Sequence, residues 1–366
     1  MNFLKKIFGS RKAEEVIDDE DFWVWFPRHA SAFFQVVKKS QQVDDDFLEK
    51  VMPRLQNINT QFYCLTGMCD KDTAELVITA EGDIKSFVFV EELVGRAPAI
   101  PGWKFTALKP PTAMDSFSLN MDAYDFDNNN IQFFYNEDDD YPDEINISLL
   151  YTGYSEQDQK TITQGCLLYL ENSLGELNMA TQIDELSVAT GLPEGKDAIP
   201  IAKLEGFLAW REKELIEKYE GTRHDTKNDD YSVMEARDKD GLPVIALINR
   251  DLLQWEAKAS HPWMMVVEIN YDGSGRSGMP DSSINTVMDR FETSLEEQLP
   301  DSEGYLNLGR VTYNGKRTIY FACKEFRRSS SVTAEALRQL PEPLQVSYDI
   351  YKDKYWQSMN RFRAED

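Results

Sequence analysis

The segment from Glu75 to Pro111 most constrains what this chain can fold into, because it alternates between the periods of strands and of a helix. Its sequence is ELVITAEGDIKSFVFVEELVGRAPAIPGWKFTALKPP. An apolar, partly β-branched run comes first, and the turn Glu81-Gly82-Asp83 follows it. Apolar side chains then recur at helical spacing until Pro98 and Pro101, which a helix does not tolerate. The segment therefore predicts a strand, a helix and a second strand that ends at Pro110-Pro111.

A longer alternation of the same kind fills residues 263–351. It predicts a strand, a helix, two strands, a helix and a strand, in the order βαββαβ. Asn314-Gly315 lies between the two middle strands and suits a type I′ hairpin, because both turn positions need positive φ. This order is that of a ferredoxin-like sandwich. A further hairpin, at about residues 231–237 and 243–249, is expected to extend the sheet.

The length of 366 residues exceeds what one hydrophobic core usually supports, which suggests two domains. Residues 190–200 are rich in Gly and Pro and form the best boundary. Both domains are expected to be α+β, with antiparallel or mixed sheets that carry helices on one face. The expected organisation is a charged tail at 1–21, an acidic domain at 22–189, a linker with a bridging helix at 190–220 and a ferredoxin-like domain with an added hairpin at 221–366.

Negative charge is concentrated in the first part of the chain. The net charge is -25, and residues 1–200 alone carry 16 Lys and Arg against 35 Asp and Glu. No basic residue lies between Lys109 and Lys160. Such a field repels nucleic acid and favours a basic protein as partner. A solvated face that only prevents aggregation explains the same charge.

The remaining composition bounds the cellular setting. Four scattered cysteines are too few for the disulfide framework of a secreted protein, so a reducing cytoplasm is expected. No apolar run approaches the roughly 20 residues that span a bilayer. The basic and apolar start, Met1 to Phe8, predicts at most a weak surface helix. The oligomeric state does not follow from the sequence.

The C-terminal half also carries a family resemblance. Residues 261–280 read HPWMMVVEINYDGSGRSGMP, the hairpin YLNLGRVTYNGKRTIYFAC comes after the predicted helix, and Asp353 and Trp356 close the pattern. Over about residues 225–362 this text resembles the bacterial domain-of-unknown-function family numbered 695. The segment Glu75 to Pro111 is similar to segments of other bacterial proteins of unknown role. Neither resemblance implies an activity.

A glycine-rich turn follows the first strand of the βαββαβ pattern. Gly273, Gly275 and Gly278 fit G-x-G-x-x-G, and Arg276 is placed to recognise an anion. The alternative function is therefore a small-ligand or nucleotide-binding sensor, or an enzyme, that uses Gly273 to Pro280. Against it, the next strand pairs back through a hairpin and ends without the acidic residue that binds ribose. A flexible turn is the simpler interpretation.

Carboxylates gather in two neighbouring loops. Asp125 and Asp127 begin like a calcium loop, but Asn130 replaces the required Gly and Asn136 replaces the bidentate Glu. The run Glu137, Asp138, Asp139 and Asp140 follows at the tip of a predicted hairpin. Both loops are candidates for binding a partner or a cation. Solvated loops are the alternative.

Residues for catalysis or for a metal centre are missing from the sequence pattern. The histidines His29, His224 and His261 have no second histidine at metal spacing, and no nucleophile stands beside a base. We therefore expect no catalytic residue, no metal site and no cofactor. The function predicted is a non-catalytic interaction module of the inhibitor or immunity type that presents its acidic surface.

Aromatic residues provide the last candidates. Trp23, Trp25 and Trp356 are of the type that anchors protein interfaces, since a flat ring buries much area at little entropic cost. Ordinary core anchors are the alternative.

Overall fold

The structure is a computed structural model that describes residues 20–40, 42–340 and 344–363. These residues form helices and several sheets, so the expected α+β class is confirmed. The predicted tail at 1–21 lies almost wholly outside the described residues, as does the segment Met1 to Phe8. Every helix in the described ranges is too short or too polar to cross a bilayer.

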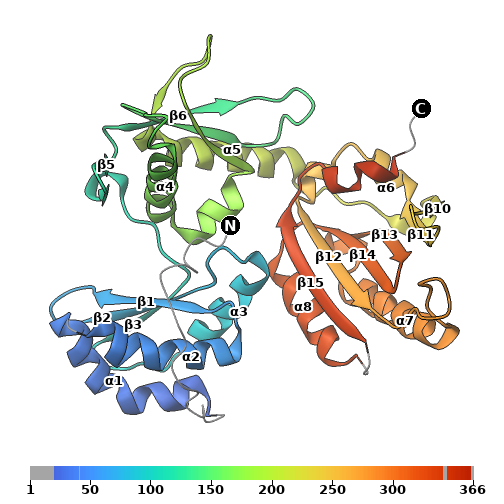
Figure 1. The fold of residues 1–366 in the computed structure, drawn as a ribbon, viewed down its shortest axis with the longest axis horizontal. Helices are drawn as coiled ribbons and strands as arrows, with labels where there is room; N and C mark the ends of the chain where they lie inside the picture. The colour runs from blue at the N-terminus through green and yellow to red at the C-terminus, as the bar shows by residue number, and fades with distance from the viewer. Residues whose placement is uncertain (1–19, 41, 341–343, 364–366) are drawn as a thin grey trace. The chain divides into compact units, whose positions relative to one another are not determined.

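The chain divides into two compact units (Figure 1). Of the described residues, the smaller unit comprises those up to Glu81 and Val90–Leu108, and the larger unit comprises Gly82–Phe89 and those from Lys109 onward. By compactness, residues 109–189 thus go with the C-terminal part of the chain. The domain boundaries expected near residues 190 and 221 stay a prediction.

The smaller unit combines helices with a three-stranded sheet. Its elements are the helices α1 (Phe22–Lys39) and α2 (Glu49–Ile58) and the strands β1 (Tyr63–Met68), β2 (Ala74–Thr79) and β3 (Trp103–Ala107). The strand order is β1-β2-β3, in which β1 pairs with β2 antiparallel and β2 with β3 parallel. Helix α3 (Ile84–Gly95) connects β2 to β3. The strand, helix and strand predicted from Glu75 to Pro111 are therefore confirmed.

Helix α1 contains a proline. It starts at Phe22 and includes Pro27 as its sixth residue. The Asp21 carboxylate accepts a hydrogen bond from the Trp23 amide at 2.8 Å and caps the helix. Pro27 removes the hydrogen bond that its position would donate to the Trp23 carbonyl, and burial of the aromatic face outweighs that cost.

The middle of the larger unit holds a second sheet. Its strands are β6 (Ile131–Asn136), β7 (Asn146–Tyr151), β8 (Glu185–Ala189) and β9 (Ile199–Pro200), in the order β8-β7-β6-β9. The short hairpin of β4 (Leu119–Met121) and β5 (Tyr124–Phe126) precedes them. Helices α4 (Gln159–Gln182) and α5 (Leu204–Tyr219) contribute Tyr169 and Leu208 to one core with Phe133 and Leu149 of the sheet. This sheet places the acidic hairpin, because residues 137–145 connect β6 to β7.

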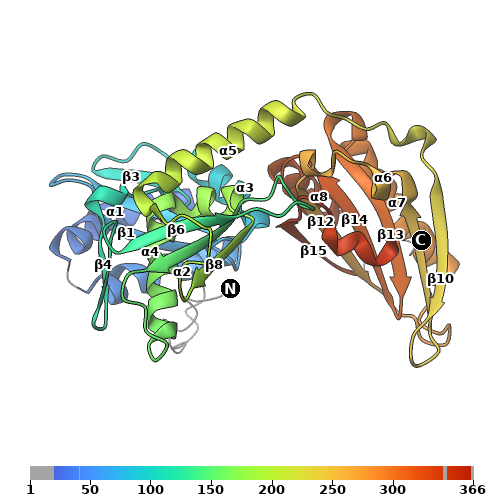
Figure 2. The same cartoon turned by 90° about the horizontal axis from the view of Figure 1, so that it is seen from above.

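The C-terminal part of the larger unit is a six-stranded antiparallel sheet, in the order β10-β11-β13-β14-β12-β15. The strands are β10 (Tyr231–Arg237), β11 (Pro243–Asn249), β12 (Trp263–Asn270), β13 (Tyr305–Tyr313), β14 (Lys316–Cys323) and β15 (Gln345–Lys352). Helices α7 (Ser282–Gln298) and α8 (Arg327–Arg338) complete the predicted order βαββαβ. The added hairpin is present, and Figure 2 shows its strand β10 at the edge of the sheet. The name ferredoxin-like stays a prediction.

Both long helices of this part pack on the same face of the sheet. Arg317 of β14 reaches Asp289 of α7, and Met265 of β12 contacts Thr333 of α8. The side chains of Arg317 and Met265 point to one face, since Ile269, four residues after Met265, is the register partner of Arg317. The opposite face packs against α6 (Arg250–Gln254) and the C-terminal turn at Gln357–Phe362.

Candidate functional site

The acidic hairpin tip consists of Glu137, Asp138, Asp139 and Asp140, and all four residues are exposed. No ion pair joins any of them to a Lys or Arg among the described residues. A hydrogen bond within the tip fixes its conformation, since the Asp140 backbone amide donates to the Asp138 carboxylate at 2.9 Å. The structure therefore places the predicted acidic residues together at the end of the β6–β7 hairpin, in solvent.

Asp143, just beyond the tip, has a different environment. Its carboxylate accepts hydrogen bonds from Lys218 at 2.7 Å and from the hydroxyls of Tyr219 and Tyr355 at 2.7 Å each. Burial raises the pKa of the Asp143 carboxyl, but these three hydrogen bonds outweigh it and hold the pKa below its ordinary value. Asp143 is thus an internal anchor of the hairpin, whereas residues 137–140 are not.

Asp125 and Asp127 form a turn that satisfies its own carboxylates. Asp127 accepts from the backbone amides of Asn129 at 2.8 Å and Asn130 at 3.2 Å, and Asp125 accepts from Asn120. This is the local hydrogen bonding of an Asx turn. Within the described ranges, no group of three or more His, Cys, Asp or Glu is arranged to hold a metal ion.

The turn from Gly273 to Pro280 presents no open phosphate cradle. The Asp281 carboxylate caps helix α7 and accepts from the Ile284 amide at 2.8 Å, so a negative charge already occupies the position where a phosphate would bind. Arg276 lies 3.5 Å from the same carboxylate. The hydrogen bond from the Ile284 amide lowers the pKa of Asp281 most, and this keeps the cap ionised.

The glycines of this turn have a packing role. A Cβ on Gly278 would lie 2.6 Å from Cα of Asn314, and a Cβ on Gly273 would lie 2.7 Å from Cα of Gly278. The Gly315 amide donates to the carbonyl of Gly278 at 2.8 Å. Close packing of the turn on the Asn314-Gly315 hairpin therefore accounts for Gly273 and Gly278 without a ligand.

The three tryptophans proposed as interface anchors are buried. The indole of Trp23 donates to the carbonyl of Leu93 at 2.7 Å, and that of Trp356 donates to the carbonyl of His261 at 3.0 Å. Trp25 lies under the guanidinium of Arg54. Their burial fits the core-anchor alternative and not an exposed interface, because apolar ring area inside the protein stabilises each core.

His261 is a buried neutral histidine. Its Nδ1 is 2.7 Å from the Ser260 hydroxyl, and in the part of the chain that the structure describes its Nε2 has no hydrogen-bond partner. Burial lowers the pKa of His261 to about 4, and the positive charge of Arg223 lowers it in the same direction. The ring therefore serves structure at neutral pH.

The low pKa of His261 predicts loss of stability in acid. The unfolded chain takes up a proton near pH 6.5, whereas the folded chain does so only near pH 4, so the free energy of unfolding falls as the pH drops through this window. Between pH 7.5 and 5 the fall due to this ring is roughly 2 kcal/mol. Urea unfolding at both pH values measures it. His261→Gln should reduce the fall by that amount, and an equal fall in both proteins would contradict the assignment.

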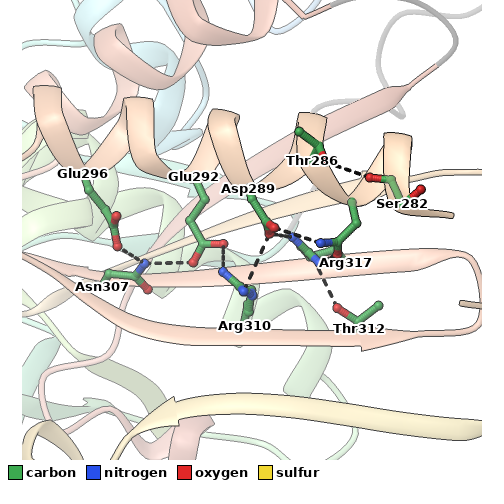
Figure 3. Close-up of polar contacts among 10 residues, drawn as sticks. Ser282, Thr286, Asp289, Glu292, Glu296, Asn307, Arg310, Thr312 and Arg317 are labelled. Carbon is green, nitrogen blue, oxygen red and sulfur yellow. Dashed lines mark hydrogen bonds and ion pairs between the residues drawn. The ribbon is translucent and has the colours of Figure 1, made fainter. Parts of the chain in front are cut away.

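A polar stripe on α7 faces the sheet (Figure 3). The stripe consists of Asn285, Asp289, Glu292 and Glu296, which recur at helical spacing along one side of the helix. The sheet side of this contact consists of Asn307, Arg310 and Arg317, whose side chains point toward the helix. Charged pairs between a helix and its sheet are an unusual way to seat a helix, and they fix its position along the strands.

The contacts of the stripe are short and numerous. Arg317 donates to Asp289 at 2.7 Å and to Asn285 at 2.6 Å, and its Nε is 3.3 Å from the Thr312 hydroxyl. Arg310 donates to Glu292 at 2.7 Å. Asn307 bridges the stripe farther along, with 2.9 Å to Glu292 and 2.7 Å to Glu296. Both guanidinium groups are therefore neutralised within the protein and are not free to bind an anion.

A groove of about 270 Å³ runs beside this stripe. Its floor is apolar and comes from Val233, Ile245 and Leu247 of β10 and β11. Its wall comes from Asn285 of α7, the two arginines below it and the end of the turn at Met279-Pro280. The sequence pattern predicted the hairpin but not the groove. The only local feature of the sequence that points to a groove is the apolar run of β11, which has apolar side chains on both faces of the strand.

Comparison with known proteins supports one relationship. Residues 235–362 match the model of a family of unknown function, DUF695, so the resemblance expected for the C-terminal part is confirmed over this span. No curated protein and no solved structure matches the chain. The matched span contains α7, its polar stripe and most of the groove. The family description assigns no activity to any of them.

Proposed function

We propose that this protein is a non-catalytic interaction module that binds a basic partner protein through the acidic hairpin tip, Glu137 to Asp140. The observation that carries the proposal is that these four carboxylates are exposed and that none forms an ion pair with a Lys or Arg of the described residues, whereas Asp143 beside them is paired with Lys218. Four like charges held together at a tip repel one another. A cationic surface that approaches the tip offsets this repulsion, so the electrostatic free energy of the complex is favourable. An inhibitor or immunity-type role, in which the tip covers a basic site, belongs to the same proposal.

The alternative of a small-ligand or nucleotide site at Gly273 to Pro280 receives less support. Asp281 occupies the start of α7, and Arg276 lies against that carboxylate. A phosphate would have to displace an anion that the helix already stabilises. The acidic tip needs no such rearrangement, and this difference favours the protein-binding function.

Removing the four tip charges should abolish most of the binding. With Glu137→Gln, Asp138→Asn, Asp139→Asn and Asp140→Asn combined, we expect the affinity for the partner to fall by about 10-fold or more at low salt, because long-range attraction to the tip is lost. The measurement starts with capture of the partner on the tagged full chain from a lysate of its source. Titration of the purified partner at two salt concentrations then gives the affinities.

The control variant removes equal charge elsewhere. It combines the substitutions Asp45→Asn, Asp230→Asn, Asp240→Asn and Glu297→Gln at exposed positions. Binding by this variant should stay within about 3-fold of the original, since screening limits charges more than about 8 Å from the contact. Equal losses in both variants would show a general charge effect and would overturn the role of the tip.

A further inference from the structure

The face of the C-terminal sheet that carries α7 and α8 continues onto β10 and β11, where no helix of the described residues covers it. Three large apolar side chains are exposed there: Val233 at 65%, Tyr231 at 47% and Ile245 at 37%. Leu247 lies beside them, half-buried in the floor of the groove. A contiguous apolar patch on a sheet face is a common mark of a protein contact.

Strand β11 has the composition of a strand that is covered on both faces. Ala246 and Ile248 are buried in the core on one side, where Leu252 and Trp356 pack against the sheet. Ile245 and Leu247 point to the other side, into the groove. Strands that are apolar on both faces are typical of sheets with a layer on each side. The second layer exists over the central strands and stops at α7.

Two carboxylates stand beside the groove. Arg310 and Arg317 are already paired with Glu292 and Asp289, so they add no free positive charge. The Asp289 side chain remains 41% exposed, and Glu235 stands exposed on β10 with no ion pair to a basic side chain in the described residues. An occupant with basic side chains along its edges complements this border.

The width of the uncovered strip suits one helix. Neighbouring strands lie about 4.8 Å apart, so two strands give about 10 Å, which is the diameter of a helix with its side chains. Helices packed side by side are separated by about 8–10 Å. A helix laid next to α7 would therefore cover β10 and β11 as α7 and α8 cover the other strands.

From these observations we propose that an amphipathic helix of a partner protein docks in the groove beside α7. Its apolar face packs on Val233, Ile245 and Leu247, and its lysines or arginines lie toward Asp289 and Glu235. This surface is separate in sequence from the acidic hairpin tip and does not depend on the function proposed for the tip. The recognition mode is that of a helix in a groove, with apolar anchors at i, i+3 or i+4, and i+7.

Two probe peptides of identical composition test the proposal. Each has about 18 residues of Leu, Lys and Ala, a length at which isolated helices form. One places Leu at helical spacing, and the other alternates Leu with Lys to favour a strand. Fluorescence anisotropy with the full chain at about 0.15 M salt should show at least about 10-fold tighter binding of the helical peptide. Equal binding of the two peptides, or equal binding of a helical peptide with Glu in place of Lys, would overturn the proposal.

A matched pair of variants locates the site. Val233→Lys should weaken binding of the helical peptide by about 10-fold or more, because it places a charge in the apolar floor. Val24→Lys adds the same charge at a position of α1 that is 49% exposed, and it should leave binding unchanged. Equal effects of the two substitutions would place the peptide elsewhere. Tighter binding of the alternating peptide, with protection of β10 amides from hydrogen exchange, would show strand addition instead.

A second copy of the chain is the remaining occupant. Sedimentation equilibrium of the full chain alone distinguishes self-association from binding of a partner helix. A monomer supports the partner helix. A dimer that Val233→Lys dissociates would assign the groove to self-association and overturn the proposal. Val233 is exposed on an edge strand, so the variant should fold, and an unchanged circular dichroism melt verifies this.

Discussion

Replacing Gly309 with alanine is expected to destabilise the larger unit by about 4 kcal/mol or more. Gly309 has a φ of 127° and lies where the pairing of β13 with β14 shifts register after Asn307. A Cβ there would lie 2.1 Å from the carbonyl oxygen of Leu247 and 2.8 Å from Cα of Ile248. Strained backbone of this kind costs about 1–3 kcal/mol. The clash adds to it, because β11 and β13 must separate and lose ladder hydrogen bonds.

Gly206 provides a control of opposite sign in the same unit. It lies in the first turns of α5, without positive φ and with nothing within 4 Å of an added Cβ. Gly206→Ala should therefore stabilise the helix by about 0.5–1 kcal/mol. Urea unfolding followed by far-UV circular dichroism measures both variants. A Gly309→Ala protein within about 1 kcal/mol of the original would contradict the role assigned to this bulge.

The C-terminal sheet was predictable because its signals are local. The order βαββαβ predicted within residues 263–351 is the order from β12 to β15, and the predicted hairpin at 231–237 and 243–249 coincides with β10 and β11. Each strand is bounded by turn residues, such as Asn314-Gly315, and the period changes from 2 to 3.6 between strand and helix. Where these signals agree, element order follows without tertiary information.

Elements that depend on distant partners were not predictable. Strand β8, Glu185–Ala189, pairs in parallel with β7, although about 40 residues separate the paired positions. No local pattern distinguishes so short a run from a loop. Helix α8 begins at Arg327, where the Glu325 carboxylate accepts from the Arg327 amide at 2.7 Å and stabilises a helix start that apolar periodicity alone does not locate.

The candidate sites divide in the same way. The acidic tip could be located from the sequence, because four consecutive carboxylates next to a turn are exposed in almost any fold. The groove could not, because exposure of Val233 and Ile245 depends on where α7 ends its cover of the sheet. The position of α7 in turn depends on contacts such as that between Asp289 and Arg317, which are 28 residues apart. Sequence periodicity does not encode a contact of this range.

Arg317→Ala should destabilise the larger unit by about 2–4 kcal/mol. The side chain is only 4% exposed and satisfies Asp289, Asn285 and the Thr312 hydroxyl at once. Without the guanidinium, the Asp289 carboxylate keeps the hydrogen bond from the Asn285 amide at 2.8 Å and the weaker contact to Arg310 at 3.6 Å, and the side-chain oxygen of Asn285 loses its donor. Arg317 is the buried member of this pair, so its removal leaves the Asp289 carboxylate, whose side chain is 41% exposed, with less compensation, and it leaves the buried Thr312 hydroxyl without the Arg317 donor.

Two comparisons separate this mechanism from a general loss of charge. Arg338→Ala breaks a pair with Glu335 in which the arginine is 71% exposed, and it should change the free energy of unfolding by less than about 1 kcal/mol. Combining Arg317→Met with Asp289→Leu removes both charges and should recover much of the stability that Arg317→Ala loses. Urea unfolding of the three proteins decides the matter, and a double variant no more stable than Arg317→Ala would contradict it. Recovery would also mean that the polar stripe does more than stabilise the protein. The stripe would then serve to fix the position of α7, and that position sets the border of the groove.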